Sequence, residues 1–236
     1  MKVIAQMNNP RPEAFNFGRM AGSYDAWYRT REGRTYDRLE KAAVLRALQP
    51  LPRGKKLLDV GCGTGHWSAF FSDQGFEVTG VDLAPEMIAV AGNKRIPHAT
   101  FQVADGQALP FKDNRFDAVV SITTLEFVSD ADRVVREMVR CVRQPGGRLL
   151  VGVLNSLARL NIERKEAGAH PYAEARLFEP DEVKDILMPY GKPTVKTAAF
   201  VPRSPGLYKY AWMTDFMGRL AQSHRGAFIT AGLKFR

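Results

Sequence analysis

From residue 57 onward, short apolar runs alternate with helix-like segments, and this pattern leaves few folds open. The runs are KLLDVG, EVTGVDL, ATFQVAD, FDAVVSI and GGRLLVGVLN. Continuous, β-branched runs of this kind are typical of strands in a parallel sheet that helices cover on both faces. Because crossovers between parallel strands are right-handed, we expect a doubly wound α/β sheet.

The segments between the runs carry helix signals. HWSAFFSDQG ends at Gly75, and APEMIAVAGNK has Pro85 in its first turn, where proline is tolerated. DADRVVREMVRCV is strongly helical because its apolar residues recur along one stripe. That stripe consists of Val134, Val135, Met138, Val139 and Val142.

The two ends of the chain differ from this core. Residues 13–48 are predicted to be helical, residues 156–178 to form an irregular insertion, and EPDEVKDILMPYG to form a further helix. TVKTAAFVP and GAFITAGLKF are predicted strands that pair antiparallel near the sheet edge. Without repeats or a credible linker, we expect one domain over residues 1–236. Its parts are an N-terminal helical segment (1–54), a core (55–155), and an insertion, cap and C-terminal strands (156–236).

Composition and charge narrow the class of protein. Hydrophobic residues at 45% and charged residues at 25% are typical of a soluble globular protein. The sequence contains no stretch of about 18 apolar residues, so a membrane-spanning helix is not expected. The N-terminus shows no secretory signal, and two cysteines, Cys62 and Cys141, suggest neither a disulfide framework nor a metal site. A cytoplasmic protein is therefore expected.

The net charge of +9 is unevenly distributed. Residues 1–56 carry 12 Lys and Arg and 5 Asp and Glu, residues 57–155 carry 9 and 12, and residues 156–236 carry 13 and 8. The basic ends could attract an anionic substrate, a nucleic acid or a membrane surface. Solvated helix faces are the simpler explanation.

Three glycines stand at alternate positions in LLDVGCGTG: Gly61, Gly63 and Gly65, preceded by Asp59. Glycine tolerates positive φ and lets a ligand approach the backbone closely. A dinucleotide site would require G-x-G-x-x-G, and a P-loop would end in Gly-Lys-Ser/Thr, but this loop continues as GTGHW. The spacing therefore favours a ligand that contains adenosine but lacks a pyrophosphate.

Acidic residues also follow the next two apolar runs. Asp82, seventeen residues after Gly65, could accept both ribose hydroxyls, and Asp105 could accept from the exocyclic amine of adenine. Alternatively, Asp82 caps a helix and Asp105 forms a turn. Acids after three successive strands, Asp59 included, favour a ligand site at the carboxyl edge of the sheet.

These motifs resemble, in order and spacing, those of the class I S-adenosylmethionine-dependent methyltransferases, above all the small-molecule and quinone-pathway enzymes. The resemblance covers about residues 55–155 and rests on LLDVGCGTG, VTGVDLAPEM, ADGQALPF, FDAVVSITTLEFV and RQPGGRLLVGVLN. It implies a Rossmann-like, mostly parallel seven-stranded sheet with helices on both faces and an antiparallel last strand. It also implies S-adenosyl-L-methionine as the cofactor. No metal site is expected, because the residues show no metal-binding constellation.

The resemblance assigns cofactor-binding roles by position. The glycine loop would cradle the methionine end of the cofactor, with Asp59 near its amino group and Asp82 on the ribose. Asp105 and Gly106 would recognise the adenine edge. The expected cofactor-binding residues are Asp59, Gly61, Cys62, Gly63, Gly65, Asp82, Leu83, Met87, Asp105, Gly106, Ile122 and Thr123.

The N-terminal helical segment commonly forms a lid over the cofactor in this family. Tyr24, Trp27 and Tyr28 fall in it, and Tyr24 and Tyr28 are four residues apart, so they would share a helix face. These aromatic side chains could shield the sulfonium and form substrate walls, or simply pack the lid onto the core. His66, just after the loop, is expected on the surface of a helix.

Glu126, in TTLEFV, is the candidate catalytic residue, at a place where many relatives carry a histidine. Its carboxylate could take a proton from the methyl acceptor or hold a cationic group. Alternatively, it is a helix-start carboxylate that the helix dipole favours.

The expected reaction is direct displacement of a methyl group onto a small-molecule acceptor, with proximity and orientation as the main contributions. A nucleic-acid methyltransferase is the first alternative, but no Asn/Asp-Pro-Pro-aromatic motif follows the fourth strand, so DNA is not expected and RNA is disfavoured. A sensor that binds the cofactor without turnover is the second.

A membrane-associated enzyme also stays open. Its signature would be an exposed apolar face on residues 13–30 or 205–220, although a substrate cap or an interface helix is the simpler interpretation of the latter. The sequence assigns neither the acceptor nor the oligomeric state.

Overall fold

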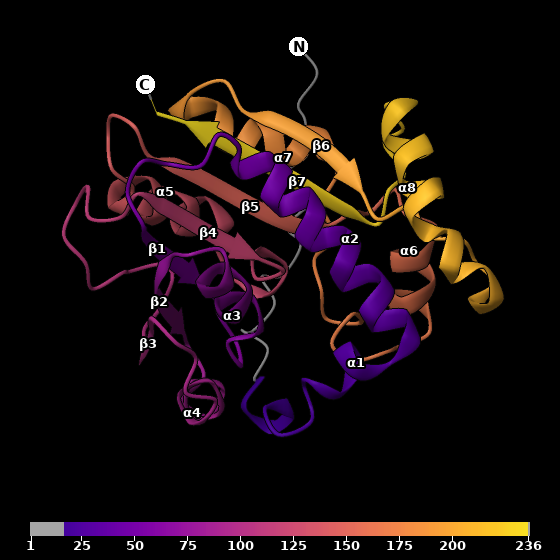
Figure 1. The fold of residues 1–236 in the computed structure, drawn as a ribbon, viewed down its shortest axis with the longest axis horizontal. Coiled ribbons are helices and arrows are strands. Elements are labelled where there is room, and N and C mark those ends of the chain that lie inside the picture. The colour runs from indigo at the N-terminus through magenta and orange to yellow at the C-terminus, as the bar shows by residue number, and fades with distance from the viewer. Residues whose placement is uncertain (1–16, 236) are drawn as a thin grey trace, which may run out of the picture.

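The alternation expected from residue 57 onward is present in a computed structural model, which describes residues 17–235 (Figure 1). Within this range, seven strands form one sheet in the order β3-β2-β1-β4-β5-β7-β6. Their bounds are β1 Lys56–Val60, β2 Glu77–Asp82, β3 Ala99–Val103, β4 Ala118–Ile122, β5 Arg148–Leu154, β6 Thr194–Ala198 and β7 Phe228–Lys234. β1 pairs in parallel with both β2 and β4, so the strand order reverses there. Open α/β sheets bind ligands beside such a reversal.

Helices cover both faces of the sheet (Figure 1). α2 Arg31–Leu48 and α3 His66–Asp73 pack on one face, and α5 Ala131–Cys141 and α7 Pro180–Leu187 on the other. Successive side chains in a strand point to opposite faces of the sheet. Leu57 therefore packs in the hydrophobic cluster under α2 and α3, and Leu58 packs in the cluster under α5 and α7. The other helical segments are η1 Phe17–Met20, α1 Ala26–Arg29, α4 Pro85–Asn93, η2 Leu125–Phe127, α6 Arg159–Glu166, η3 Met188–Tyr190, η4 Pro205–Tyr210 and α8 Ala211–Leu220.

The last two strands confirm the predicted antiparallel pairing. β7 pairs antiparallel with β5 on one side and with β6 on the other, so that Phe228 lies opposite both Leu154 and Ala198. β6 is therefore the edge strand, and β7 lies inside the sheet. The mostly parallel seven-stranded sheet with an antiparallel last strand is confirmed.

The prediction of a helical segment over residues 13–48 was wrong in one respect. Residues 13–16 lie outside the described residues, and the remainder is broken by a turn over residues 21–25 and again at Thr30. The ψ of Thr30 is 160°, and its hydroxyl accepts a hydrogen bond from the Gly33 amide at 2.9 Å. Thr30 thus acts as an N-cap that starts α2 afresh after the single turn of α1.

The prediction of an irregular insertion over residues 156–178 was also wrong, because this segment contains α6. No apolar stripe marks α6 in the sequence. The buried Asn161 holds it instead, since its amide donates to the carbonyls of Asn155 at 2.9 Å and Ala227 at 2.8 Å. A helix held largely by polar contacts gives no periodic apolar signal.

Candidate functional site

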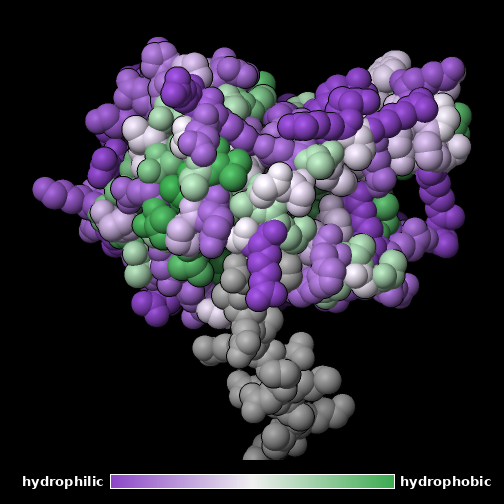
Figure 2. All heavy atoms as spheres, turned by 90° about the horizontal axis from the view of Figure 1, so that it is seen from below, coloured by the Kyte–Doolittle hydropathy of each residue, from purple (hydrophilic) through white to green (hydrophobic). Residues whose placement is uncertain are grey.

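A cavity of about 430 Å³ lies at the carboxyl ends of β1, β2 and β4. Eight of the twelve residues expected to bind the cofactor line it: Gly61, Gly63, Asp82, Leu83, Met87, Asp105, Gly106 and Thr123. A larger cavity, of about 640 Å³, runs along β6 and contains none of the twelve. Figure 2 views the molecule from the side of η1 and α4, and hydrophobic side chains gather on the half of this face where β1–β3 and α4 lie.

The glycine loop forms the wall of the cavity next to β1. Gly61, Gly63 and Gly65 have φ angles of 75°, 52° and 79°, in the left-handed region that favours glycine. A Cβ atom on Gly61 would lie 2.2 Å from the Thr124 side chain, whereas one on Gly63 would meet no atom within 4 Å. The backbone at Gly63 is therefore open to a ligand in the cavity.

Asp82 ends β2 and fixes the loop from the opposite side. One carboxylate oxygen accepts a hydrogen bond from the Gly63 amide at 2.9 Å, and the other accepts from the Ala84 amide at 2.9 Å, just before α4. Burial raises the pKa of Asp82 above its usual value. The side chain thus joins two loops and still lines the cavity, so both roles considered from the sequence coexist.

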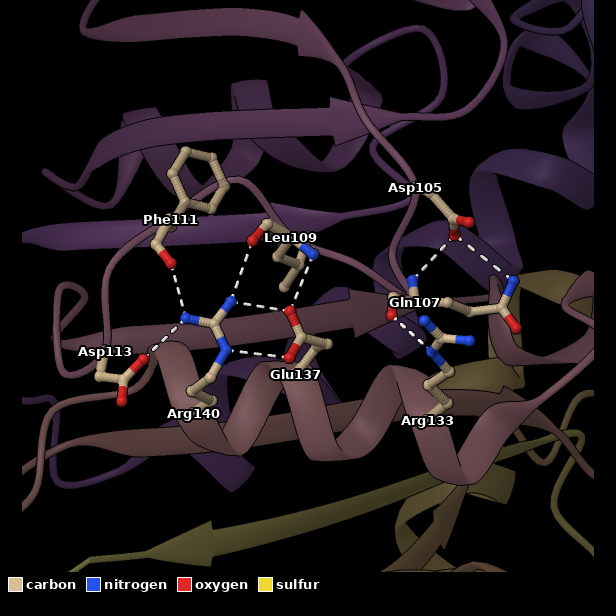
Figure 3. Close-up of polar contacts among 8 residues, drawn as sticks. All are labelled: Asp105, Gln107, Leu109, Phe111, Asp113, Arg133, Glu137 and Arg140. Atoms are coloured by element: carbon tan, nitrogen blue, oxygen red, sulfur yellow. Dashed lines mark hydrogen bonds and ion pairs between the residues drawn. The ribbon is translucent and has the colours of Figure 1, made fainter.

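Asp105 lies in a loop that α5 clamps in place (Figure 3). Its Oδ1 accepts from the Gln107 amide at 2.8 Å, which is the turn-forming role. Farther along the loop, Arg140 donates to the carbonyl oxygens of Leu109 at 2.9 Å and Phe111 at 2.6 Å, as Figure 3 shows. The polar face of α5 thereby positions the loop that carries Asp105.

Glu137, on the same helix, also holds this loop. Its Oε2 accepts from the Leu109 amide at 2.8 Å and lies 2.7 Å from Arg140. The hydrogen bond from Arg140 is the main reason that the pKa of Glu137 lies below its usual value. Arg133 completes the clamp by donating to the Gln107 carbonyl at 2.9 Å.

The turn after β4 carries backbone strain. Thr123 has a φ of 50°, which is a true outlier for a β-branched residue. Its amide donates to the Gly152 carbonyl at 2.7 Å, and the Thr124 hydroxyl donates to the Gly61 carbonyl at 3.2 Å. Strained residues held by such contacts cluster at functional sites, and Thr123 lines the cavity.

The N-terminal segment covers part of the cavity. Phe17 and Tyr24 both line it, and the ring centroid of Phe17 lies 4.8 Å from that of Phe127 in an edge-to-face arrangement. Asp25 fastens this cover to the body of the protein. Its carboxylate accepts from the Thr64 hydroxyl at 2.7 Å and pairs with Lys94 at 2.5 Å.

Four of the expected cofactor-binding residues do not line the cavity: Asp59, Cys62, Gly65 and Ile122. Asp59 is buried and accepts from the Ser68 hydroxyl at 2.7 Å, and burial raises the pKa of Asp59 to about 7. Cys62 and Ile122 are buried as well. A Cβ on Gly65 would lie 3.2 Å from Ala91 and Phe101, so this glycine allows α4 and β3 to approach.

Trp27 and Tyr28 also lie outside the cavity lining. Trp27 packs with the cluster under α2 and α3. Tyr28 stacks on His66 with ring centroids 3.6 Å apart, and His66 Nε2 lies 2.7 Å from Asp37 on α2. Only Tyr24 of the expected lid aromatics lines the cavity, so His66 and Tyr28 serve to join the lid to α2.

Glu126 lies behind the cavity wall. It is fully buried, its Oε1 accepts from the Leu154 amide at 2.6 Å, and its Oε2 has no hydrogen-bond partner among residues 17–235. Burial raises the pKa of Glu126 to about 8. The side chain therefore ties η2 to the end of β5, and its burial favours the protonated form.

Sequence reasoning missed the residues that close the cavity from the side of η2. Phe17, Thr124 and Phe127 all line it. The aromatic pair carried no positional signal, because its members are far apart in the chain. The side-chain contact of Thr124 with Gly61 also depends on the tertiary structure.

Comparison with known proteins agrees with this geometry. Residues 58–151, which contain the glycine loop, Asp82, Asp105 and Thr123, match the family described as Methyltransferase domain. A demethylmenaquinone methyltransferase of Beutenbergia cavernae is 43% identical over 115 residues, which is 49% of this chain and 47% of the relative. A malonyl-[acyl-carrier protein] O-methyltransferase of Serratia marcescens is 34% identical over 146 residues, or 62% and 54%. The chain thus spans about half the length of these two curated relatives.

A solved structure resembles nearly the whole chain. The Thermotoga maritima protein described as an SAM-dependent methyltransferase, possible histamine N-methyltransferase, superposes with a TM-score of 0.68 at 22% identity. The superposition covers 93% of this chain and 98% of that one. The two proteins therefore share a fold over nearly the whole length of both chains.

Proposed function

Because the chain belongs to the class I S-adenosylmethionine-dependent methyltransferases, we propose that it transfers a methyl group from S-adenosyl-L-methionine to a small-molecule acceptor. The observation that carries this proposal is the cavity at the carboxyl ends of β1, β2 and β4. It brings together the open backbone of Gly63, the Asp82 carboxylate and the strained turn at Thr123.

The residues around the cavity fit this cofactor. Each oxygen of Asp82 accepts one backbone hydrogen bond and keeps a lone pair that can accept from a ribose hydroxyl. Leu83 and Met87 offer apolar walls for adenine, and Asp105 can accept from its amine. We assign the methionine end to the glycine loop, where a Cβ at Gly63 would project into free space.

The cofactor, when bound, supplies a methyl group that its sulfonium activates toward direct displacement. The chain itself has to bind the cofactor and the acceptor, orient them toward each other and exclude water. Phe17, Tyr24 and Phe127 line the covered side of the cavity, and Asp25 holds this cover to Thr64 and Lys94. Orientation of this kind can lower a barrier by several kcal/mol without a dedicated base.

We assign Glu126 a positioning role in this reaction. Its carboxyl fixes η2, which carries Phe127, to the end of β5. It is fully buried and does not line the cavity, so its carboxyl has no direct access to an acceptor there. Tyr24 is the lid residue that we place beside the acceptor, because it lines the cavity.

The relatives favour a small acceptor. One is described as acting on demethylmenaquinone and the other on malonyl-[acyl-carrier protein], so quinone-like and acyl acceptors come first in a search. We extend the same assignment to residues 1–236 as one methyltransferase domain with an N-terminal lid.

A labelling experiment tests the transfer. Protein is incubated with S-adenosylmethionine carrying a labelled methyl group and a cell extract, and the label is followed into small-molecule, lipid, protein and nucleic-acid fractions. We expect label in the small-molecule or lipid fraction, or in the protein fraction on an acyl group that a carrier protein holds. Label in RNA alone, or cofactor binding without any transfer, would replace the proposal with one of the two alternatives.

Calorimetry tests the cofactor site itself. Asp82→Asn should weaken binding of S-adenosylmethionine and S-adenosylhomocysteine roughly tenfold or more, because a charged acceptor of two hydrogen bonds is lost. Asp73→Asn on the exposed end of α3 is the matched control and should leave both affinities unchanged. Preference for NADH over both ligands would overturn the assignment, provided that circular dichroism shows the variants to be folded.

A further inference from the structure

α8 presents its large apolar side chains to solvent. Trp212, Phe216 and Leu220 are 60%, 51% and 66% exposed, and Met213 and Met217 lie beside them on the same side of the helix. Leu207 and Tyr210 of the preceding η4 are exposed as well. We call these seven residues the α8 surface: Leu207, Tyr210, Trp212, Met213, Phe216, Met217 and Leu220. Figure 1 shows α8 at the outer edge of the molecule, beside the end of β6.

The inner side of α8 is made of small and polar residues. Ala211 and Asp215 are buried, and a Cβ on Gly218 would lie 2.4 Å from the Phe200 ring. A surface helix of a globular protein usually has the reverse pattern, with its apolar stripe toward the core. The outer side of α8 is therefore suited to contact with another apolar surface.

Buried hydrogen bonds fix this orientation. Asp215 Oδ1 accepts from the Ala199 amide at 2.7 Å, and Oδ2 accepts from Arg219 at 2.7 Å. Rotating α8 to bury Trp212 would carry Asp215 to the surface and leave the buried Ala199 amide without its acceptor. The exposed face is therefore a feature of the packed structure and not of a loosely placed helix.

The segment that carries the α8 surface has an excess of positive charge. Residues 200–226 contain four cationic side chains, Arg203, Lys209, Arg219 and Arg225, and a single acid, Asp215, which is buried. Three of the cations, Arg203, Lys209 and Arg225, are exposed. An apolar helix face with Trp and Tyr, bordered by Lys and Arg, is the pattern of helices that lie in the interface of an anionic bilayer.

We propose that the α8 surface docks this protein on an anionic membrane surface. Among residues 17–235, no helix is both long and apolar enough to cross a bilayer, so the contact would be peripheral. The aromatic and thioether side chains would enter the headgroup region, and the bordering cations would contact lipid phosphates. The proposal does not depend on the proposed methyl transfer.

Flotation with vesicles tests this docking directly. Vesicles of phosphatidylcholine alone are compared with vesicles that also contain phosphatidylglycerol, at low and high salt. We expect binding to the anionic vesicles that weakens with salt, because the cations act within a Debye length of the surface. Trp212 is more exposed than the buried Trp67 and the half-buried Trp27, so its fluorescence should shift to the blue on binding.

Two sets of substitutions separate the contributions. Phe216→Ser with Leu220→Ser should weaken vesicle binding by more than about tenfold, because two apolar side chains no longer enter the bilayer. Arg203→Gln, Lys209→Gln and Arg225→Gln should each weaken binding about fivefold and reduce its salt dependence. Leu51→Ser with Met188→Ser, two exposed apolar residues outside the α8 surface, is the control and should bind as the unchanged protein does.

Three results would overturn the proposal. The first is no binding to either vesicle, and the second is binding that the α8 substitutions do not alter. The third is a dimer in solution that Phe216→Ser with Leu220→Ser converts to a monomer, which would assign the surface to a second copy of the chain. None of these readings requires turnover, so failure here leaves the proposed methyl transfer untouched.

Discussion

Buried carboxyl groups dominate the electrostatics of individual residues in this protein. Burial raises the pKa of Glu126 to about 8, and the pKa values of Glu40 and Asp59 to about 7. Between the ordinary carboxyl pKa and these values, the native state keeps protons that the unfolded chain has released. The free energy of unfolding should therefore fall as pH rises through this window.

Glu126→Gln tests the largest of these effects. The amide can still accept from the Leu154 amide but cannot ionise, so the variant should lose less stability than the unchanged protein between about pH 5 and pH 8. The difference should reach on the order of 3 kcal/mol in the free energy of unfolding from urea titrations. Glu163→Gln on the exposed side of α6 should leave the slope unchanged.

The same variant tests the positioning role of Glu126. We expect it to retain most of its kcat, because the residue lies behind the cavity wall. A loss of kcat much larger than tenfold, with unchanged stability, would return Glu126 to the position of a catalytic residue.

At the residue scale, the sequence could predict the site residues that a local sequence pattern marks. Eight of the twelve expected cofactor residues line the cavity, because glycines and acids at strand ends carry positional meaning. Asp59 instead bonds to Ser68, and Thr123 adopts a strained φ, through contacts that only the packed structure creates. Phe17 and Phe127 are more than a hundred residues apart in the chain, so the sequence could not predict that they meet at the cavity.

Among the elements, α5 acts as the support of the Asp105 loop. Arg140→Ala would remove its hydrogen bonds to the carbonyls of Leu109 and Phe111 and should cost about 1–3 kcal/mol of stability. We also expect S-adenosylmethionine to bind roughly threefold to tenfold more weakly, although Arg140 does not line the cavity.

Arg136→Ala supplies the control for this prediction, since Arg136 is exposed on the same helix. Calorimetry and thermal unfolding measure the two effects. Equal affinity for the unchanged protein and Arg140→Ala would show that the loop holds its shape without the clamp.

Helices were predictable where an apolar period marks them. The stripe on α5 gave its position, and its residues Val134, Val135 and Met138 are buried as that stripe requires. α6 carries no such stripe and was missed, because the amide of Asn161 fixes it. The break at Thr30 was missed because an N-cap inside a helical composition is recognised only by its backbone geometry.

For the molecule as a whole, Asp25 controls how firmly the N-terminal cover is held. Although burial opposes ionisation, hydrogen bonds from Lys94 and Thr64 keep the pKa of Asp25 below its usual value. The stabilising ion pair is therefore present at neutral pH and is lost as pH falls toward and below the ordinary carboxyl pKa.

Asp25→Asn should loosen the cover without unfolding the sheet. We expect trypsin to cleave at the exposed Arg29 several times faster, and S-adenosylhomocysteine to dissociate faster in stopped-flow measurements. Ser23→Ala, in the same exposed turn, is the matched control. Unchanged cleavage in Asp25→Asn would mean that other contacts, such as those of Phe17 with Phe127 and of Tyr28 with His66, hold the cover in place.

The position of β7 between β5 and β6 also has a consequence for synthesis on the ribosome. β6 is made before its only strand neighbour in the described sheet, and the apolar α8 is made in the interval between them. Until β7 emerges, the edge of β5 and both edges of β6 lack partners, and open strand edges invite pairing with other chains. The nascent protein would therefore depend most on chaperones just before β7 leaves the exit tunnel.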